Sequence, residues 1–228
     1  EALDAVVEAR DRGIHAFAET CPHYLFLDQS EYDRPGFEAA KYVMTPPLRD
    51  HKCQHALWRG LQFDDLQIVA TDHCPFCFNE NAQGLLKSKQ YGKDDFNKIP
   101  NGAPGVELRL SLLYDGGVVA GKINLNRFVQ LTATAPAKMF GLFPQKGTIV
   151  VGSDADIVIF DPNERHTLSA STHHSNVDYS LFEGRQVQGK VKKVFLRGDL
   201  IVDGERWLGR AGMGEYRKRS ASGRVLAG

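Results

Sequence analysis

Asp72 is the residue whose place in the sequence most favours chemistry. It follows Gln67-Ile68-Val69-Ala70, a run with the length of a buried strand, with only Thr71 between them. In α/β barrels the working side chains stand at the C-terminal ends of strands, and a carboxylate there can bind a metal and accept a proton from water. The alternative is an aspartate that caps the following turn. Asp72 is therefore a candidate metal ligand and general base, and a capping role stays open.

Histidine and cysteine patterns elsewhere give weaker signals. His23 and His73 also lie near predicted strand ends, but a lone histidine is more often structural than functional. His51 and His55 share one helix face, yet the glutamate of the metalloprotease motif is absent between them, which favours a solvated face. The segment Cys74–Cys77 has redox or zinc spacing, but it lacks a second ligand pair and thioredoxin-like surroundings. A structural role is the expectation for this segment.

The elements that must position these residues are of two kinds. Apolar residues at helical spacing predict helices, and short apolar runs between turn residues predict strands. Helices are expected over residues 2–12, 50–61, 106–114, 125–134 and 136–142. Strands are expected over residues 14–18, 67–70, 147–152, 156–161, 187–196 and 200–202, and a long loop over 79–102. Strands that alternate with helices indicate βα units and a parallel sheet.

The pattern changes near residue 145, where strands separated by turns replace the βα units. We expect the C-terminal part of a catalytic domain over residues 1–145, a small β domain over 146–206 and a tail over 207–228. The tail is rich in Gly, Arg and Lys and is expected to be disordered or to lie across a neighbouring subunit. Because the chain opens inside a helical pattern with no cap residue, we also expect it to begin partway through a longer protein.

The composition indicates which kinds of partner and cell compartment to expect. The 28 basic and 28 acidic residues balance to a formal net charge of zero, which gives no reason to expect a nucleic acid or membrane partner. No apolar run approaches the ~18 residues of a membrane-spanning helix. The four cysteines are irregularly spaced, which fits a reduced, cytoplasmic protein.

A series of segments then resembles the dihydropyrimidinase and D-hydantoinase family of the amidohydrolase superfamily, in order along nearly the whole chain. These segments are Ala18-Glu19-Thr20-Cys21-Pro22-His23-Tyr24-Leu25, Thr45-Pro46-Pro47-Leu48-Arg49, Thr71-Asp72-His73-Cys74, Asp95-Phe96-Asn97-Lys98-Ile99-Pro100-Asn101-Gly102, Lys146-Gly147-Thr148-Ile149, Gly152-Ser153-Asp154-Ala155-Asp156, Val177-Asp178-Tyr179 and Phe182-Glu183-Gly184. The resemblance implies an α/β fold, namely the C-terminal part of a (β/α)8 TIM-type barrel with part of a small β-sandwich.

The resemblance also implies the site. Asp72 matches the family's last metal ligand, which also acts as the general base. Thr45, where relatives usually have serine, and Asn101 match residues whose main-chain groups hold the substrate ring. The family uses two zinc ions, and the remaining ligands, including a carboxylated lysine, would lie upstream of Glu1. His23 and His73 match no ligand position. The residues from Gln83 to Lys89 look like an insertion relative to the family.

The activity implied by the resemblance is zinc-dependent hydrolysis of the cyclic amide bond of dihydropyrimidines or 5-substituted hydantoins to N-carbamoyl amino acids. Allantoinase is one alternative, because it shares the Glu19–Leu25 stretch. A non-catalytic scaffold of the collapsin-response-mediator type is another, although retention of Asp72 argues against it. The family implies a homotetramer with a small-molecule substrate. The 228 residues alone are expected to bind no zinc pair and to be inactive.

Overall fold

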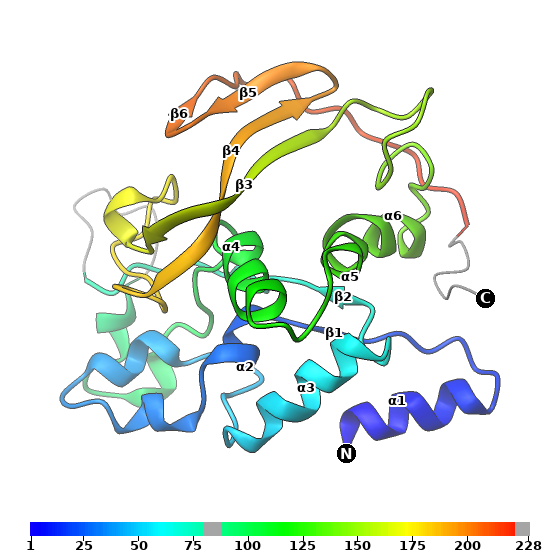
Figure 1. Ribbon diagram of the computed structural model, residues 1–228. Helices are drawn as coiled ribbons and strands as arrows, with labels where there is room; N and C mark the ends of the chain where they lie inside the picture. The colour runs from blue at the N-terminus through cyan, green and yellow to red at the C-terminus, as the bar shows by residue number, and fades with distance from the viewer. Residues whose placement is uncertain (80–87, 222–228) are drawn as a thin grey trace.

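The computed structural model describes residues 1–79 and 88–221 and has two layers (Figure 1). One layer contains the helices and a pair of short parallel strands. The other is an antiparallel sheet, which lies across helix α4. None of the helices in the described residues has the length and apolar character needed to cross a bilayer.

Two helices have about the bounds that the sequence predicts. They are α1, Ala2–Asp11, and α3, Lys52–Gln62, and α3 buries Trp58 and Leu61 against the core. The shorter α-helices are α2 Pro22–Phe26, α4 Arg109–Leu113, α5 Leu125–Val129 and α6 Ala135–Met139. Wider π-helical turns, Tyr114–Val119 and Gln130–Thr134, continue α4 and α5. Single 3-10 turns cover Gln29–Asp33, Glu38–Tyr42, Lys89–Gly92, Phe96–Lys98 and Ala170–Thr172.

The parallel strands are β1, Glu19–Thr20, and β2, Ile68–Val69, and they pair in register. Main-chain hydrogen bonds extend the pair at both ends, from the Gln67 N–H to the Ala18 carbonyl (3.0 Å) and from the Ala70 N–H to the Thr20 carbonyl (2.8 Å). Because parallel strands end at the same edge of a sheet, the segments that follow β1 and β2 begin side by side at that edge. Asp72 is on one of these segments.

The antiparallel sheet has the strand order β3-β4-β5-β6. Its long strands are β3, Ile157–Thr167, and β4, Gln186–Leu196, and its short ones are β5, Asp199–Asp203, and β6, Arg206–Trp207. The predicted strands at 156–161, 187–196 and 200–202 are thereby confirmed, and β3 runs further than expected. Residues 197 and 198 make the turn between β4 and β5.

Two apolar clusters hold the layers together. The first packs the chain after α2 against α4 and the segment before β4, through residues that include Tyr42, Met44, Leu48, Leu112, Tyr179 and Phe182. The second joins α2, α3, β2, α4 and α5 through residues that include Leu25, Trp58, Leu61, Val69, Leu113 and Leu131. The sheet is also tied to the helices by the Gln188 N–H, which donates to the Asp115 carboxylate at 3.0 Å.

Two predicted strands are wrong. Residues 14–18 have no regular structure, and β1 begins only at Glu19. Ile14 is 56% exposed, and the Ala18 N–H donates to the Gln67 side chain at 2.9 Å instead of to a strand. Residues 147–152 form turns, because Gly147 and Gly152 have φ values of 80° and 97°, which reverse the chain at both ends of the run.

The tail contacts its own chain, and its expected place across a neighbouring subunit stays a prediction. As far as Ala221 it lies against its own chain, where Arg217 pairs with Asp154 at 3.3 Å and the Ser220 N–H donates to the Gly141 carbonyl at 2.9 Å. Within the expected 79–102 loop, the described part contains two 3-10 turns, and most of the suspected insertion falls on residues outside the described ranges. The domain division at residue 145 stays a prediction.

Candidate active site

Asp72 stands just past the end of β2 in a backbone conformation that side chains rarely adopt. Its φ is 45°, in the left-handed region, which aspartate tolerates better than most residues. The side chain is exposed, and within residues 1–79 and 88–221 its carboxylate has no hydrogen-bond or ion-pair partner. A capping aspartate would accept a main-chain N–H, so the capping interpretation finds no support in the described contacts. The strained backbone is a reason to look for function here.

The segment after β1 lies within range of the Asp72 charge. Burial lowers the pKa of His23 to about 4, and the Asp72 carboxylate acts in the opposite direction. Burial raises the pKa of Cys21 to about 12, and here Asp72 adds to the shift. His23 is 5% exposed, and its Nε2 atom has no hydrogen-bond partner among the described residues. At neutral pH this edge therefore carries a neutral imidazole and a neutral thiol beside the Asp72 side chain.

The structure brings Thr45 and Asn101 together although they are 56 residues apart. The Asn101 Nδ2 atom donates to the Thr45 hydroxyl at 2.8 Å. Next to this contact, the Gly102 N–H donates to the Val43 carbonyl at 3.0 Å. Thr45 and Asn101 are both exposed, so the two segments form one accessible unit with polar groups at its surface.

The segment that carries Asp72 touches this unit directly. His73 and Ala103 form a parallel bridge, and the Cys74 N–H donates to the Ala103 carbonyl at 3.1 Å. Gly102 has a φ of 139° and approaches Cys74 so closely that a Cβ atom on Gly102 would lie 2.6 Å from the Cys74 Cβ. All three predicted site residues thus lie on segments that contact one another, in the order 72–74, 101–103, 43–45.

The other histidines named from the sequence have structural surroundings. The Nδ1 atom of His73 accepts hydrogen bonds from the N–H groups of Gly105 (3.1 Å) and Val106 (3.3 Å). Burial lowers the pKa of His73, which favours the neutral ring that these hydrogen bonds require. His55 on α3 and His51, which immediately precedes that helix, are both exposed, as expected for a solvated face.

A metal ion in a protein is held by several converging side chains. Within the described ranges, no three His, Cys, Asp or Glu side chains converge closely enough to hold an ion. Asp72 fits as a single oxygen ligand, because its carboxylate is exposed and has no partner in the part of the chain that the structure describes. A metal site at this edge needs ligands from elsewhere.

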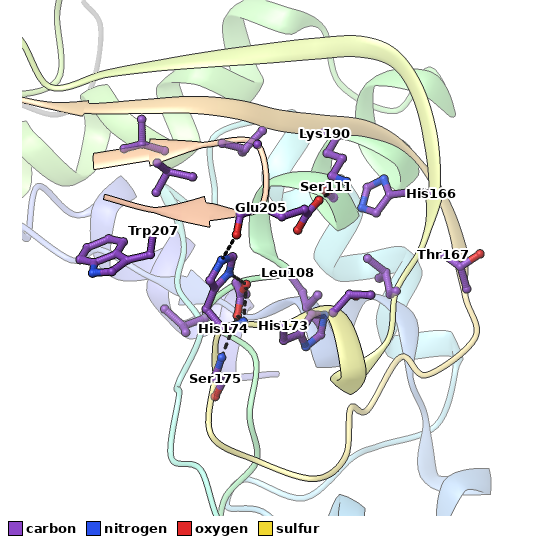
Figure 2. A pocket seen from close by; sticks show the side chains of 18 of the residues that line it. Leu108, Ser111, His166, Thr167, His173, His174, Ser175, Lys190, Glu205 and Trp207 are labelled. Atoms are coloured by element: carbon purple, nitrogen blue, oxygen red, sulfur yellow. Dashed lines mark hydrogen bonds and ion pairs between the residues drawn. The ribbon is translucent and has the colours of Figure 1, made fainter. Parts of the chain in front are cut away.

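A cavity of about 650 Å³ lies between α4 and the antiparallel sheet, away from the predicted site (Figure 2). His73 is in its lining, but Asp72, Thr45 and Asn101 are not. In its lining, His174 Nδ1 lies 2.7 Å from Glu107 and His174 Nε2 lies 3.1 Å from the Glu205 carbonyl. The buried His166 Nδ1 and His173 Nε2 atoms have no hydrogen-bond partner among the described residues. The cavity is therefore separate from the three predicted site residues.

Sequence reasoning missed Lys89. It is completely buried and hydrogen-bonds to main-chain carbonyls of both segments that carry Thr45 and Asn101. The sequence indicated Lys89 only as the end of the suspected insertion, and lysine in a polar loop is normally solvated.

Comparisons with known proteins identify the family of the chain. The amidohydrolase family matches residues 48–201. D-Hydantoinase from Streptomyces coelicolor is 49% identical over 220 residues, which is 96% of this chain and 45% of that protein. D-Hydantoinase from Geobacillus stearothermophilus is 46% identical over 227 residues, which is 100% of this chain and 47% of that protein.

A solved structure of the same family is also similar to this chain. The crystal structure of dihydropyrimidinase from Brevibacillus agri superposes with a TM-score of 0.91 at 50% identity, over 97% of this chain and 46% of that one. This chain spans about half the length of the relatives that it matches. The predicted α/β fold class, part of a barrel with part of a β-sandwich, is confirmed. The chain belongs to the amidohydrolase family, in the branch of the dihydropyrimidinases and D-hydantoinases.

Proposed function

We propose that the whole protein is a zinc-dependent cyclic amidohydrolase. It hydrolyses the cyclic amide bond of dihydropyrimidines or 5-substituted hydantoins and releases N-carbamoyl amino acids. The observation that carries the proposal is the exposed carboxylate of Asp72, which has no partner among the described residues and lies on a segment that contacts the loop of the Asn101–Thr45 pair. The names of the relatives, D-hydantoinase and dihydropyrimidinase, support the same substrate class.

Asp72 has two roles in this proposal. It is one ligand of the metal centre and it is the general base that takes a proton from the attacking water. A bound zinc ion supplies Lewis acidity, which lowers the pKa of water and polarises a carbonyl group. When the ring C–N bond breaks, Asp72 returns the proton to the leaving ring nitrogen. One water is consumed, and the products are a carboxylate and an N-carbamoyl group.

Thr45 and Asn101 bind the ring. A cyclic imide or ureide presents alternating N–H and C=O groups at its edge, and main-chain groups of two adjoining segments can pair with them in a fixed orientation. The hydrogen bond between the two side chains (2.8 Å) supports a fixed spacing of these segments. Fixed orientation of the scissile carbonyl accelerates attack by removing motions that do not lead to reaction.

The cofactor in this proposal is a pair of zinc ions. Asp72 supplies one ligand, and the other ligands, including a carboxylated lysine, come from outside these 228 residues. The matched relatives are about twice as long as this chain, which supports a ligand set divided in this way. We further propose that the protein is cytoplasmic and forms a homotetramer. Sedimentation of the full-length protein tests the oligomeric state.

The experiment is an assay of the full-length protein with dihydrouracil, hydantoin and allantoin, after removal of metal with a chelator and after reloading with zinc. Zinc-restored hydrolysis of dihydrouracil or hydantoin supports the proposal. Turnover of allantoin alone would replace it with an allantoinase. A zinc-loaded protein that opens none of the three rings would favour the scaffold alternative.

A further inference from the structure

Lys89 is a buried cation whose three donors all meet main-chain oxygen atoms. Its side chain has no exposed surface. The Nζ atom donates to the carbonyls of Val43 (3.0 Å), Gly102 (2.8 Å) and Pro100. An ammonium group has three N–H donors, so these contacts use its full capacity. Without such partners a buried lysine would be strongly destabilising.

The three carbonyls belong to the two proposed ring-binding segments. Val43 lies two residues before Thr45, whereas Pro100 and Gly102 flank Asn101 on either side. The Val43 carbonyl also accepts the Gly102 N–H at 3.0 Å, so one oxygen atom is shared by the ammonium group and the opposite segment. The ammonium group therefore fixes the main chain on both sides of Asn101 relative to the segment of Thr45.

The backbone at Lys89 is anchored to a third segment. The Lys89 N–H donates to the Cys77 carbonyl at 2.8 Å, and the hydroxyl of the preceding Ser88 donates to the Phe78 carbonyl at 2.9 Å. Residues 77 and 78 continue the segment that carries Asp72. Lys89 thus connects the segment of the proposed base to both segments of the proposed ring site.

The direct contacts between the two ring segments, from Asn101 to Thr45 and from Gly102 to Val43, are hydrogen bonds between neutral groups. The Asn101–Thr45 hydrogen bond is exposed to solvent, and a neutral hydrogen bond contributes only about 1 kcal/mol. Hydrogen bonds from an ionised donor are about twice as strong as neutral ones, and those of Lys89 are shielded from water. Burial lowers the pKa of Lys89 to about 8, so burial of the charged ammonium group costs folding free energy.

We propose that Lys89 is a positioning residue for ring recognition, which sets the spacing of the Thr45 and Asn101 segments and thereby the affinity for the substrate ring. This inference rests on the proposed function. It assigns to Lys89 an effect on KM that a residue needed only for folding would not have.

The test is Lys89→Met in the full-length, zinc-loaded protein, with rates scaled to the folded fraction measured by near-ultraviolet circular dichroism. Lys98→Met is the matched control, because Lys98 is in the same loop but its side chain is 56% exposed and pairs with Asp95 at the surface. We expect kcat/KM of Lys89→Met to fall by roughly 100-fold, mostly through a higher KM, since displacement of binding groups by about 1 Å has effects of this size. The control should keep the wild-type KM.

A second comparison separates positioning from folding. Lys89 and Thr45 act on the same contact in this proposal, so the effects of Lys89→Met and Thr45→Ala on KM should be smaller together than their sum. If Lys89→Met does not fold, Lys89→Arg is the test, because a planar guanidinium cannot match three convergent carbonyls and KM should still rise.

The outcomes are distinct. A wild type that hydrolyses neither dihydrouracil nor hydantoin overturns the proposed function and this inference with it. An active wild type, with a lysine variant that keeps the wild-type KM, overturns the inference alone. Additive effects of the two substitutions on KM would also overturn it.

Discussion

Replacement of Gly102 by alanine should displace Asn101 and reduce ring hydrolysis. The added Cβ would lie 2.6 Å from the Cys74 Cβ and 2.7 Å from the Cys74 carbonyl oxygen, and φ at this position is 139°. Ordinary contacts begin at 3.4 Å, so the loop must move by about 1 Å. We expect a loss of about 3 kcal/mol of folding free energy from strain and overlap. We also expect a loss of about 100-fold in kcat/KM from misplaced binding groups.

Gly105→Ala is the matched control for this prediction. Gly105 is in the same loop, but a Cβ there would meet only the Thr71 carbonyl oxygen, at 3.6 Å. Urea unfolding and hydantoin hydrolysis by the full-length protein measure both effects. If Gly102→Ala behaved like Gly105→Ala in both assays, the reasoning from the close approach of Gly102 to Cys74 would be refuted.

Further predictions concern stability and the isolated chain. His174 hydrogen-bonds to Glu107, which raises the pKa of His174, while the pKa of Glu107 is lowered by those hydrogen bonds despite its burial. The ion pair therefore contributes fully to folding stability between pH 4.5 and 6.5, the ordinary pKa values of the two groups. His174→Gln should be most destabilising in this range and less so at higher pH, because wild-type His174 then loses its proton. A destabilisation that grows with pH would contradict this. Arg127 donates to the Leu61 (2.6 Å) and Leu66 (2.8 Å) carbonyls and pairs with Asp64, so Arg127→Met should cost about 3 kcal/mol in urea unfolding, and a neutral result would refute it. The 228-residue chain alone should bind no zinc pair and show no hydrolase activity, which equilibrium dialysis and a hydantoin assay check; two tightly bound zinc ions per chain would refute this.

The sequence predicted elements best where burial and pairing coincide. The strand at Ile68–Val69 and the helix at Lys52–Gln62 have apolar patterns that the core uses directly. The run at 147–152 is equally apolar, yet Val151 is fully exposed and Ile149 is 81% exposed. Apolar composition indicates strand propensity, but a strand also needs a partner, and glycines that reverse the chain at both ends leave none.

The candidate site could be predicted only in part. Asp72 follows a predicted strand in the sequence, and this local pattern is sufficient to predict it as a candidate site residue. The contact of Asn101 with Thr45 joins residues 56 apart, which no spacing rule supplies, so both were named only through the resemblance to the family. Lys89 escaped notice because its partners are main-chain carbonyls, and these carry no signature in a sequence.

The central claim is that Asp72 is the catalytic carboxylate of a metal-dependent ring amidase, and Asp72→Asn tests it most directly. This change keeps the size of the side chain and removes its negative charge and basicity. Hydantoin and dihydrouracil turnover would be measured in the full-length protein beside its zinc content. The account predicts an active wild type and a loss of at least about 100-fold in kcat for the variant, even in its zinc-loaded fraction. A zinc-loaded Asp72→Asn protein with wild-type kcat would contradict the account.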